Sequence, residues 1–255
     1  MKKSCLIILV KALNFSVNAV VASCLLLLFA CGCYKIYDSH EIYQRADSDF
    51  ATYQSPGIKA KKKMVSFDKL KKLNPDVFGW LEVEGTNISY PVLKCSDNLK
   101  YVNTDVKGKF SLVGGIFLDC RNKTDFSDKN NIIHGHHMDK NRMFGGLDKF
   151  RKKGYFKKHK TGWLYYEKSW HKISFFAFVE GDAYDSVLYG PWIERNDEYL
   201  RYVKGHAKRF RKIKIGENDR FVTLSTCKGR TTNGRSLSVS YTHLRAPETE
   251  LHLVC

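Results

Sequence analysis

The chain has 255 residues, 43% of them hydrophobic, and a formal net charge of +17. Once an apolar N-terminal segment is set aside, the remainder suits one domain with a sizeable core, and no internal repeat or long low-complexity tract occurs. The basic residues are spread over 59–72, 149–160 and 204–214 without an RNA- or DNA-binding signature, so we expect no nucleic-acid partner. A solvated basic surface is the ordinary explanation, and attraction to an anionic cell envelope is the sharper hypothesis.

The first segment, residues 13–34, is apolar enough and long enough to span a bilayer, which takes about 20 residues. Lys2, Lys3 and Lys11 precede it, so the positive-inside rule places the N-terminus in the cytoplasm. We therefore expect a cytoplasmic tip and a signal-anchor transmembrane helix over residues 1–34, in a single-pass protein of the cell membrane whose remaining chain is extracellular.

Two other interpretations of this segment stay open. A cleaved signal peptide is one, although no small-x-small cleavage site stands out. A lipoprotein attached at Cys31 is the other, although Phe29 fits a lipobox poorly. The mixed-charge stretch 35–63 that follows is expected to be an extracellular stalk.

The chain after the stalk shows mostly short strand patterns. Residues 66–73 begin with a capping Ser66 and predict a short helix that ends before Pro75. Apolar or alternating runs then predict strands, with a turn at 85–87 joining the first two. These predicted strands are 80–83, 88–93, 115–119, 131–133, 163–166, 173–179 and 221–226.

One helix is expected to interrupt this pattern. Asn196 or Asp197 can cap it, and Tyr199, Leu200, Val203, Ala207 and Phe210 repeat at helical spacing. Many short strands with few helices are typical of an antiparallel barrel or sandwich.

A nucleophile, an acid–base group and a cation occur in the second half of the chain. Cys227 ends a β-branched apolar run, Arg235 follows it, and a cluster of three histidines at 134–137 lies upstream. A thiol can attack a carbonyl, an imidazole can move protons, and a guanidinium can hold an oxyanion, so the set suggests acyl transfer. Taken singly, each feature has a plainer explanation: a buried thiol, a solvated or metal-binding histidine cluster, and a surface arginine. A Cys95–Cys120 disulfide that leaves Cys227 inert is also open.

At these residues the chain resembles a known family. Thr223-Leu-Ser-Thr-Cys227 followed by Arg235 is similar to the active-site signature of sortases, the cysteine transpeptidases of Gram-positive cell surfaces. Class B sortases fit best, because further similar segments run in order from about residue 66 to 237. They are Asn-Pro-Asp-Val-Phe-Gly-Trp at 74–80, Gly-Thr-Asn-Ile-Ser-Tyr-Pro at 85–91, Gly-Ile-Phe-Leu-Asp-Cys-Arg-Asn at 115–122, Gly-His-His-Met at 135–138 and Met-Phe-Gly at 143–145.

The resemblance implies a mainly β fold with added helices: the eight-stranded sortase β-barrel, an N-terminal helix and a helix in the connection before the catalytic strand. The catalytic domain would occupy residues 64–239.

Two features depart from the family pattern. Some class B members carry an acidic residue close behind the cysteine, where this chain has Lys228-Gly229. Residues 240–255 are atypical and include Pro247, which suits no central strand, so we expect a truncated or chimeric tail and a barrel at risk of lacking its last strand.

The resemblance also assigns roles. Cys227 would be the nucleophile, His136 the acid–base group and Arg235 the oxyanion or substrate donor. His137 is the second candidate for the imidazole and His134, which stands where the family more often has Tyr, the third. Arg230 competes with Arg235. Substrate binding would involve Ser225, Thr226 and His137.

The implied reaction is cleavage of an NPxTN- or SPxTG-type sorting motif after its Thr, through a thioacyl-enzyme, and transfer to an amine. Its partners would be surface proteins that bear the motif, peptidoglycan or its lipid-linked precursor, and the cell membrane. No cofactor and no metal is expected. The alternatives are a surface cysteine peptidase that only hydrolyses and a non-catalytic, basic wall-binding module.

Overall fold

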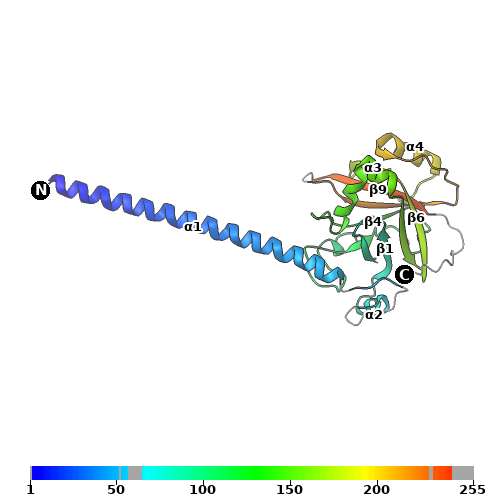
Figure 1. The fold of residues 1–255 in the computed structure, drawn as a ribbon, viewed down its shortest axis with the longest axis horizontal. Helices are drawn as coiled ribbons and strands as arrows, with labels where there is room; N and C mark the ends of the chain where they lie inside the picture. Colours follow the sequence, from blue (N-terminus) through cyan, green and yellow to red (C-terminus); the bar gives the residue numbers. More distant parts are fainter. Residues whose placement is uncertain (1, 52, 57–64, 230–231, 243–255) are drawn as a thin grey trace. The chain divides into compact units, whose positions relative to one another are not determined.

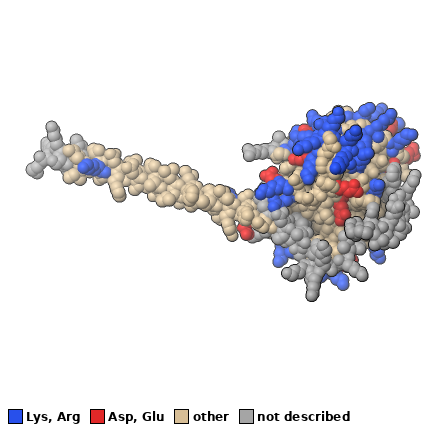
Figure 2. Space-filling view, in the orientation of Figure 1, with Lys and Arg blue, Asp and Glu red and all other residues tan. Residues whose placement is uncertain are grey.

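The computed structural model describes residues 2–51, 53–56, 65–229 and 232–242. It consists of two compact units, Met1–Arg45 and Ala46–Cys255 (Figure 1). The first is formed by helix α1, Lys2–Ala51, whose last residues, from Ala46, belong to the second unit. Its stretch Ile7–Ile42 is long and apolar enough to cross a membrane, properties that an N-terminal signal sequence shares. Figure 2 shows the middle of this helix without charged side chains, and the sequence has none between Lys11 and Lys35.

The second unit is a closed β-barrel. Its strands are β1 (Val77–Val83), β2 (Ser89–Leu93), β3 (Ile116–Leu118), β4 (Asn130–His134), β5 (Thr161–Tyr166), β6 (Ser169–Asp182), β7 (Ala207–Phe210), β8 (Arg220–Cys227) and β9 (Gly234–Thr242). The order is β5-β1-β2-β3-β4-β8-β9-β6-β7, and an additional β5–β6 pairing closes a ring of eight strands, with β7 added outside on β6. The prediction of an eight-stranded barrel is therefore confirmed.

Both predicted helices are present. In α2 (Phe67–Leu73) the Ser66 side chain accepts a hydrogen bond from the Lys69 amide, so the predicted cap is correct. The second helix, α4 (Asn196–His206), lies in the connection before β8. Three short helices not predicted from the sequence complete the unit: η1 (Lys100–Val102), η2 (Phe144–Arg151) and α3 (Lys153–Lys158).

The prediction for α4 was wrong at both ends. Arg195 occupies the cap position and makes no side-chain capping bond, while the Asn196 amide instead donates to the carbonyl of Gly216. The helix ends at His206, and Ala207–Phe210 forms strand β7 on β6. Helical spacing of the apolar residues continues to Phe210, but pairing with the exposed edge of β6 satisfies the backbone there.

The closing strand, doubtful from the sequence, is present. β9 pairs with β8 from Arg220↔Thr242 to Cys227↔Arg235, and with β6 along its other edge. The expectation that the barrel could lack its last strand is therefore wrong, because alternating residues up to Thr242 are enough to pair. Pro247 and the rest of 243–255 lie outside the described residues, and a truncated or chimeric origin of that tail stays a prediction.

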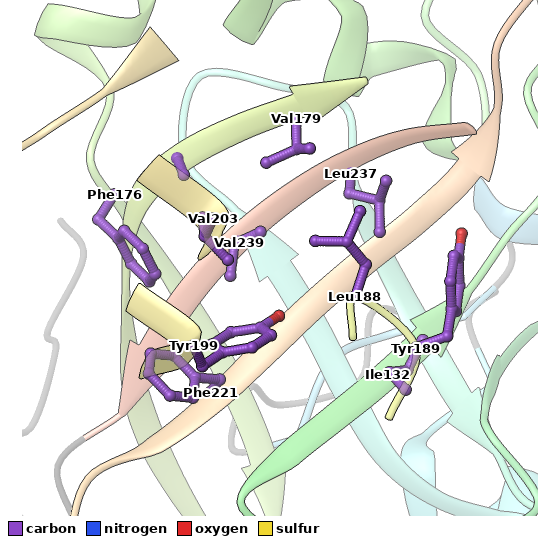
Figure 3. Packing of buried hydrophobic residues seen from close by; sticks show 11 residues of the cluster. Ile132, Phe176, Val179, Leu188, Tyr189, Tyr199, Val203, Phe221, Leu237 and Val239 are labelled. Carbon is purple, nitrogen blue, oxygen red and sulfur yellow. The ribbon is translucent and has the colours of Figure 1, made fainter. Parts of the chain in front are cut away.

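The core holds the catalytic-strand candidate rigidly. Tyr199 and Val203 of α4 pack over Phe221 of β8, and the Tyr199 and Phe221 rings lie 4.5 Å apart (Figure 3). All three side chains are at most 2% exposed. Full burial of such side chains contributes about 2 kcal/mol each. Helix α4 therefore packs on the start of the strand that ends at Cys227.

Candidate active site

Two parallel strands bring the histidine cluster beside the thiol. β4 and β8 pair from Asn130↔Phe221 to His134↔Ser225, and the Gly135 amide donates to the Ser225 carbonyl at 3.1 Å. Since parallel strands end at the same edge of a sheet, His136 and Cys227 emerge together.

The antiparallel neighbour supplies the cation. Cys227 at the end of β8 is directly paired with Arg235 at the start of β9. Residues directly opposite each other in adjacent strands have Cβ atoms about 5 Å apart, so the thiol and the guanidinium share one neighbourhood.

These elements border a cleft of about 770 Å³. Cys227, His136 and Arg235 all line it, as do Ser225 and Thr226. The fold thus brings together five of the six predicted site residues. The remaining lining residues are Asn98, Val102, Phe117, Asp119, Arg121, His134, Gly135, Ala183, Tyr184, Asp185, Ser186, Tyr189, Gly190, Pro191 and Trp192.

His136 is held by the backbone. Its Nε2 lies 2.7 Å from the carbonyl oxygen of Val102, which can only accept, so Nε2 carries a proton and Nδ1 is the atom left to exchange one. One glycine makes room for this ring, and a second lets the chain just before it pack closely. A Cβ on Gly114, whose φ is +64°, would lie 2.9 Å from Cδ2 of His136 and 2.6 Å from the Val102 oxygen. A Cβ on Gly135 would lie 2.4 Å from Ile116 and 2.8 Å from Phe144.

The other two histidines have different partners. His137 does not line the cleft, and its Nε2 lies 2.8 Å from Oδ2 of Asp148. This hydrogen bond raises the pKa of His137 and outweighs the opposing effect of burial. Nε2 of His134 lies 3.1 Å from Oδ2 of Asp119. The three rings do not converge on one point, and no group of three or more His, Cys, Asp or Glu within the described residues could hold a metal ion.

Asp119 organises one wall of the cleft. It is 1% exposed and accepts from Nε and Nη2 of Arg121, at 2.8 and 2.9 Å, and from Asn98 at 3.0 Å. Burial raises the pKa of Asp119, but the hydrogen bonds from His134 and Arg121 lower it more, so the carboxyl stays ionised well below its ordinary range. Arg121 also donates to the Tyr189 carbonyl at 3.0 Å, which ties this wall to the loop before α4.

Ser225 and Thr226 differ in what they contact. The Ser225 hydroxyl is hydrogen-bonded to the Tyr189 hydroxyl at 2.5 Å. Burial raises the pKa of Tyr189 to about 12, so this phenol is protonated at neutral pH. Oγ1 of Thr226 is buried and has no hydrogen-bond partner within the described part of the chain. Thr226 therefore has an unused polar atom at the cleft, whereas Ser225 is already engaged.

Arg235 is fixed through one nitrogen. Its Nη1 donates to the carbonyl oxygens of Thr232 and Gly234 at 3.1 and 3.0 Å. A guanidinium has five N–H donors, so the remaining ones are available to a substrate. Arg230, the competing candidate, lies outside the described residues. Next to the thiol, Lys228 pairs with Glu180 at 2.6 Å.

The cysteines do not form the disulfide that the sequence left open. Cys95 and Cys120 are both free thiols and partly buried. Cys227 is also a free thiol and only partly buried, so a reagent can reach it in the cleft.

Comparison with known proteins agrees with this geometry. No family model matches the chain. The chain is 36% identical to sortase B of Listeria monocytogenes over 162 residues, which are 62% of this chain and 65% of that protein, just under two thirds of its length. The structure superposes on a class B sortase of Streptococcus pyogenes involved in pilus biogenesis with a TM-score of 0.66 and 42% identity, covering 69% of this chain and 97% of that one. The chain belongs to the class B sortase family. A Staphylococcus aureus sortase B–substrate complex is also similar, with a TM-score of 0.64 and 26% identity over 81% of this chain and 93% of that one.

Several residues of this class B sortase site were missed by sequence reasoning. The carbonyl of Val102, which holds Nε2 of His136, lies 34 residues away in the sequence and was not predicted. Asp119 and Arg121 come from the loop after β3 and Tyr189 from the connection before α4, and no local pattern connects the two loops. Asp119 and Arg121 do lie within the matched segment 115–122, which was the one available signal.

Proposed function

We propose that the protein is a membrane-anchored cysteine transpeptidase. The supporting observation is that Cys227, His136 and Arg235 line one cleft, in the chain of a class B sortase. The substrate would be a surface protein with an NPxTN- or SPxTG-type sorting motif, and the acceptor an amine of peptidoglycan or its lipid-linked precursor.

In the first half of the proposed reaction, the Cys227 thiol gives its proton to His136, and Sγ attacks the carbonyl carbon of the motif's Thr. The peptide C–N bond breaks, and the leaving amine takes a proton from His136. Because Nε2 of His136 is bonded to the Val102 carbonyl, the proton would pass through Nδ1. The free N–H groups of Arg235 would donate to the tetrahedral oxyanion.

In the second half, the acceptor amine attacks the thioester. Its proton goes to His136, the C–S bond breaks, and His136 passes the proton to Sγ, which regenerates the thiol of Cys227. Thr226 would add a substrate contact through its backbone where it lines the cleft, because its hydroxyl is buried. Ser225 would act through Tyr189, to which it is bonded. No step calls for a cofactor.

The proposed location follows from α1. The stretch Ile7–Ile42 can span a bilayer, and Lys2, Lys3 and Lys11 at its start favour a cytoplasmic N-terminus. The barrel would then face outward, where the sorting substrates are. Protease added to intact cells should digest the barrel and leave an epitope at the N-terminus protected; protection of both would contradict this orientation.

The test uses the full chain in a neutral detergent with peptides carrying each motif. Mass spectrometry of the trapped intermediate should show the peptide, up to its Thr, attached at Cys227. Cys227→Ala should give no adduct. Cys120→Ala, which removes another partly buried free thiol, should leave adduct formation unchanged.

The same reaction separates transfer from hydrolysis. With a peptidoglycan-type amine present, the product mass should shift by the mass of that amine. Identical products with and without the amine would favour the surface peptidase that only hydrolyses. No adduct with either peptide, together with an unchanged cellular effect of Cys227→Ala, would favour the non-catalytic wall-binding module.

A further inference from the structure

Two stretches of the barrel unit carry basic residues and no acidic ones. Residues 149–160 contain seven Lys or Arg, and residues 201–214 contain another seven. Together they hold nearly a third of the chain's 43 basic residues. Chance placement among 26 acidic residues would not be expected to leave both stretches free of compensating charge.

The fold joins these two stretches into one face. Arg211, which follows β7, donates to the carbonyls of Phe156 in α3 and Phe175 in β6. Its guanidinium also lies 4.7 Å from the centre of the Phe156 ring. The segment after β7 is therefore packed directly against α3. Figure 2 shows Lys and Arg gathered over the part of the unit where Figure 1 labels α3 and α4. We call residues 149–160 and 201–214 together the basic face.

Most charges of the basic face form no ion pair within the described part of the protein. Two of its arginines do: Arg151 pairs with Glu180 at 2.9 Å, and Arg201 with Asp197 at 3.4 Å. Nine of its lysines, in contrast, are exposed, and none forms an ion pair within the described residues. They are Lys152, Lys153, Lys157, Lys158, Lys160, Lys204, Lys208, Lys212 and Lys214. Crowding so many like charges costs free energy through repulsion, which an anionic partner would remove.

The chemistry of the face narrows that partner. Helices that bind a lipid surface usually add exposed apolar side chains that enter the acyl region. Neither stretch of the basic face has an exposed large apolar side chain. Binding of single-stranded nucleic acid relies on exposed aromatic rings for stacking, and the aromatic residues here are buried or partly buried. Lysines act as point charges and suit phosphate groups without demanding a fixed geometry.

We propose that the basic face is a second binding site, for a linear, flexible polyanion with phosphate groups along its chain. Such a polymer can follow both stretches, and its binding releases counterions, so the affinity falls steeply with salt. The site is independent of the proposed catalytic function. The basic face is connected to the catalytic cleft through Glu180. This residue pairs with Arg151 of the basic face and also with Lys228, which follows Cys227.

The test places the full chain in phosphatidylcholine nanodiscs, so that α1 is already in lipid, and titrates it with linear inorganic polyphosphate. The variant Lys157→Gln/Lys158→Gln/Lys208→Gln/Lys212→Gln removes two exposed lysines from each stretch. The matched control Lys69→Gln/Lys72→Gln/Lys109→Gln/Lys123→Gln removes four exposed lysines elsewhere and gives the same net charge.

The basic-face variant should bind at least tenfold more weakly at about 0.1 M salt, and the slope of log Kd against log salt should fall by about 3, since each of the four lost contacts accounts for about 0.7–0.9 of the slope. The control should stay within about twofold of the parent chain. Without polymer, the parent chain, the basic-face variant and the control should cleave the sorting peptide at the same rate. If none of the three cleaves it, the proposed catalytic function is contradicted and the polyanion site is not.

Three results would overturn the proposal. The first is no binding of polyphosphate by the parent chain. The second is an equal loss in the control, which would mean that net charge alone matters. The third is tighter binding, lost in the basic-face variant, to phosphatidylglycerol vesicles or to a single-stranded oligonucleotide at equal phosphate concentration, which would assign the face to lipid or nucleic acid instead.

Discussion

The carbonyl oxygen of Val102 lies 2.7 Å from Nε2 of His136, and Gly114 packs against both. A backbone acceptor thus does for this ring what a carboxylate does in many other sites: it fixes the tautomer and the orientation. It does so without adding a negative charge beside the thiol. The position of the ring therefore depends on how well the segment around Val102 is packed.

Gly114→Ala should damage both catalysis and stability. The new Cβ would meet the Val102 oxygen at 2.6 Å and His136 at 2.9 Å, and φ is +64°. We expect kcat/KM for the sorting peptide to fall about tenfold to a hundredfold, since small displacements of a reacting group have effects of that size. Gly108→Ala is the control, because its φ is +80° but nothing lies within 4 Å of its Cβ position. Gly108→Ala should lose roughly 1–2 kcal/mol of unfolding free energy, and Gly114→Ala roughly 1–3 kcal/mol more, because backbone oxygens must move; equal kinetics in the two would refute the role of Gly114.

Arg235→Gln should lower kcat about a hundredfold, with an unchanged far-UV spectrum, because it removes a charged donor to the oxyanion. Arg235→Lys should recover little, since an ammonium lacks the planar arrangement of donors. Arg220→Gln, at the other end of β8, is the control and should leave kcat unchanged. Full activity of Arg235→Gln would transfer the role to another cation.

His137 should affect stability and not substrate affinity. Its hydrogen bond to Asp148 raises its pKa, so the pair stabilises the fold fully below the unfolded-state pKa of about 6.5. This contribution is lost as pH rises through the higher folded-state pKa. Since Asp148 is partly exposed, it should amount to roughly 0.5–1 kcal/mol.

Urea unfolding between about pH 5 and pH 9 measures how the free energy of unfolding changes with pH. Asp148→Asn should remove the part of this pH dependence that comes from His137. His137→Gln should leave KM within about twofold of the parent. A clear rise in KM with unchanged stability would instead support the substrate-binding role predicted from the sequence.

Asp119→Asn should weaken both the fold and the cleft. The carboxylate is 1% exposed and holds Arg121, His134 and Asn98. We expect a loss of about 2–3 kcal/mol of unfolding free energy at neutral pH, less than for a fully buried pair because Arg121 can be solvated. KM should rise because one wall loosens.

The lowered pKa of Asp119 determines how its contribution to the free energy of unfolding changes with pH. Its stabilisation is complete above the unfolded-state value of about 4 and is lost only as pH falls through the much lower folded-state pKa. The difference between parent and variant should therefore stay constant from about pH 5 to pH 8. Asp125→Asn, at an exposed carboxylate hydrogen-bonded to the Ser127 amide, is the control and should cost much less.

Sequence reasoning succeeded where the signal is local. Ser66 as a helix cap, the strand that ends at Cys227 and the apolar N-terminal helix each follow from neighbouring residues. It failed at Phe210, where helical spacing continues into a strand because the free edge of β6 is a better partner than another helical turn. It also failed at the closing strand, since the charges and Pro247 beyond Thr242 hid a segment that pairs well.

The sequence by itself determined the chemistry that is available: a thiol at a strand end, a histidine after a glycine and an arginine eight residues past the thiol. Only the tertiary structure decided that His134 and His136 line the cleft with Cys227 while His137 does not, because each ring is oriented by a partner distant in sequence: Asp119, Val102 or Asp148. It also decided that two separate basic stretches form one face, through Arg211. Hydrogen bonds and packing across long sequence separations are set by the closure of the barrel, and no local pattern encodes them.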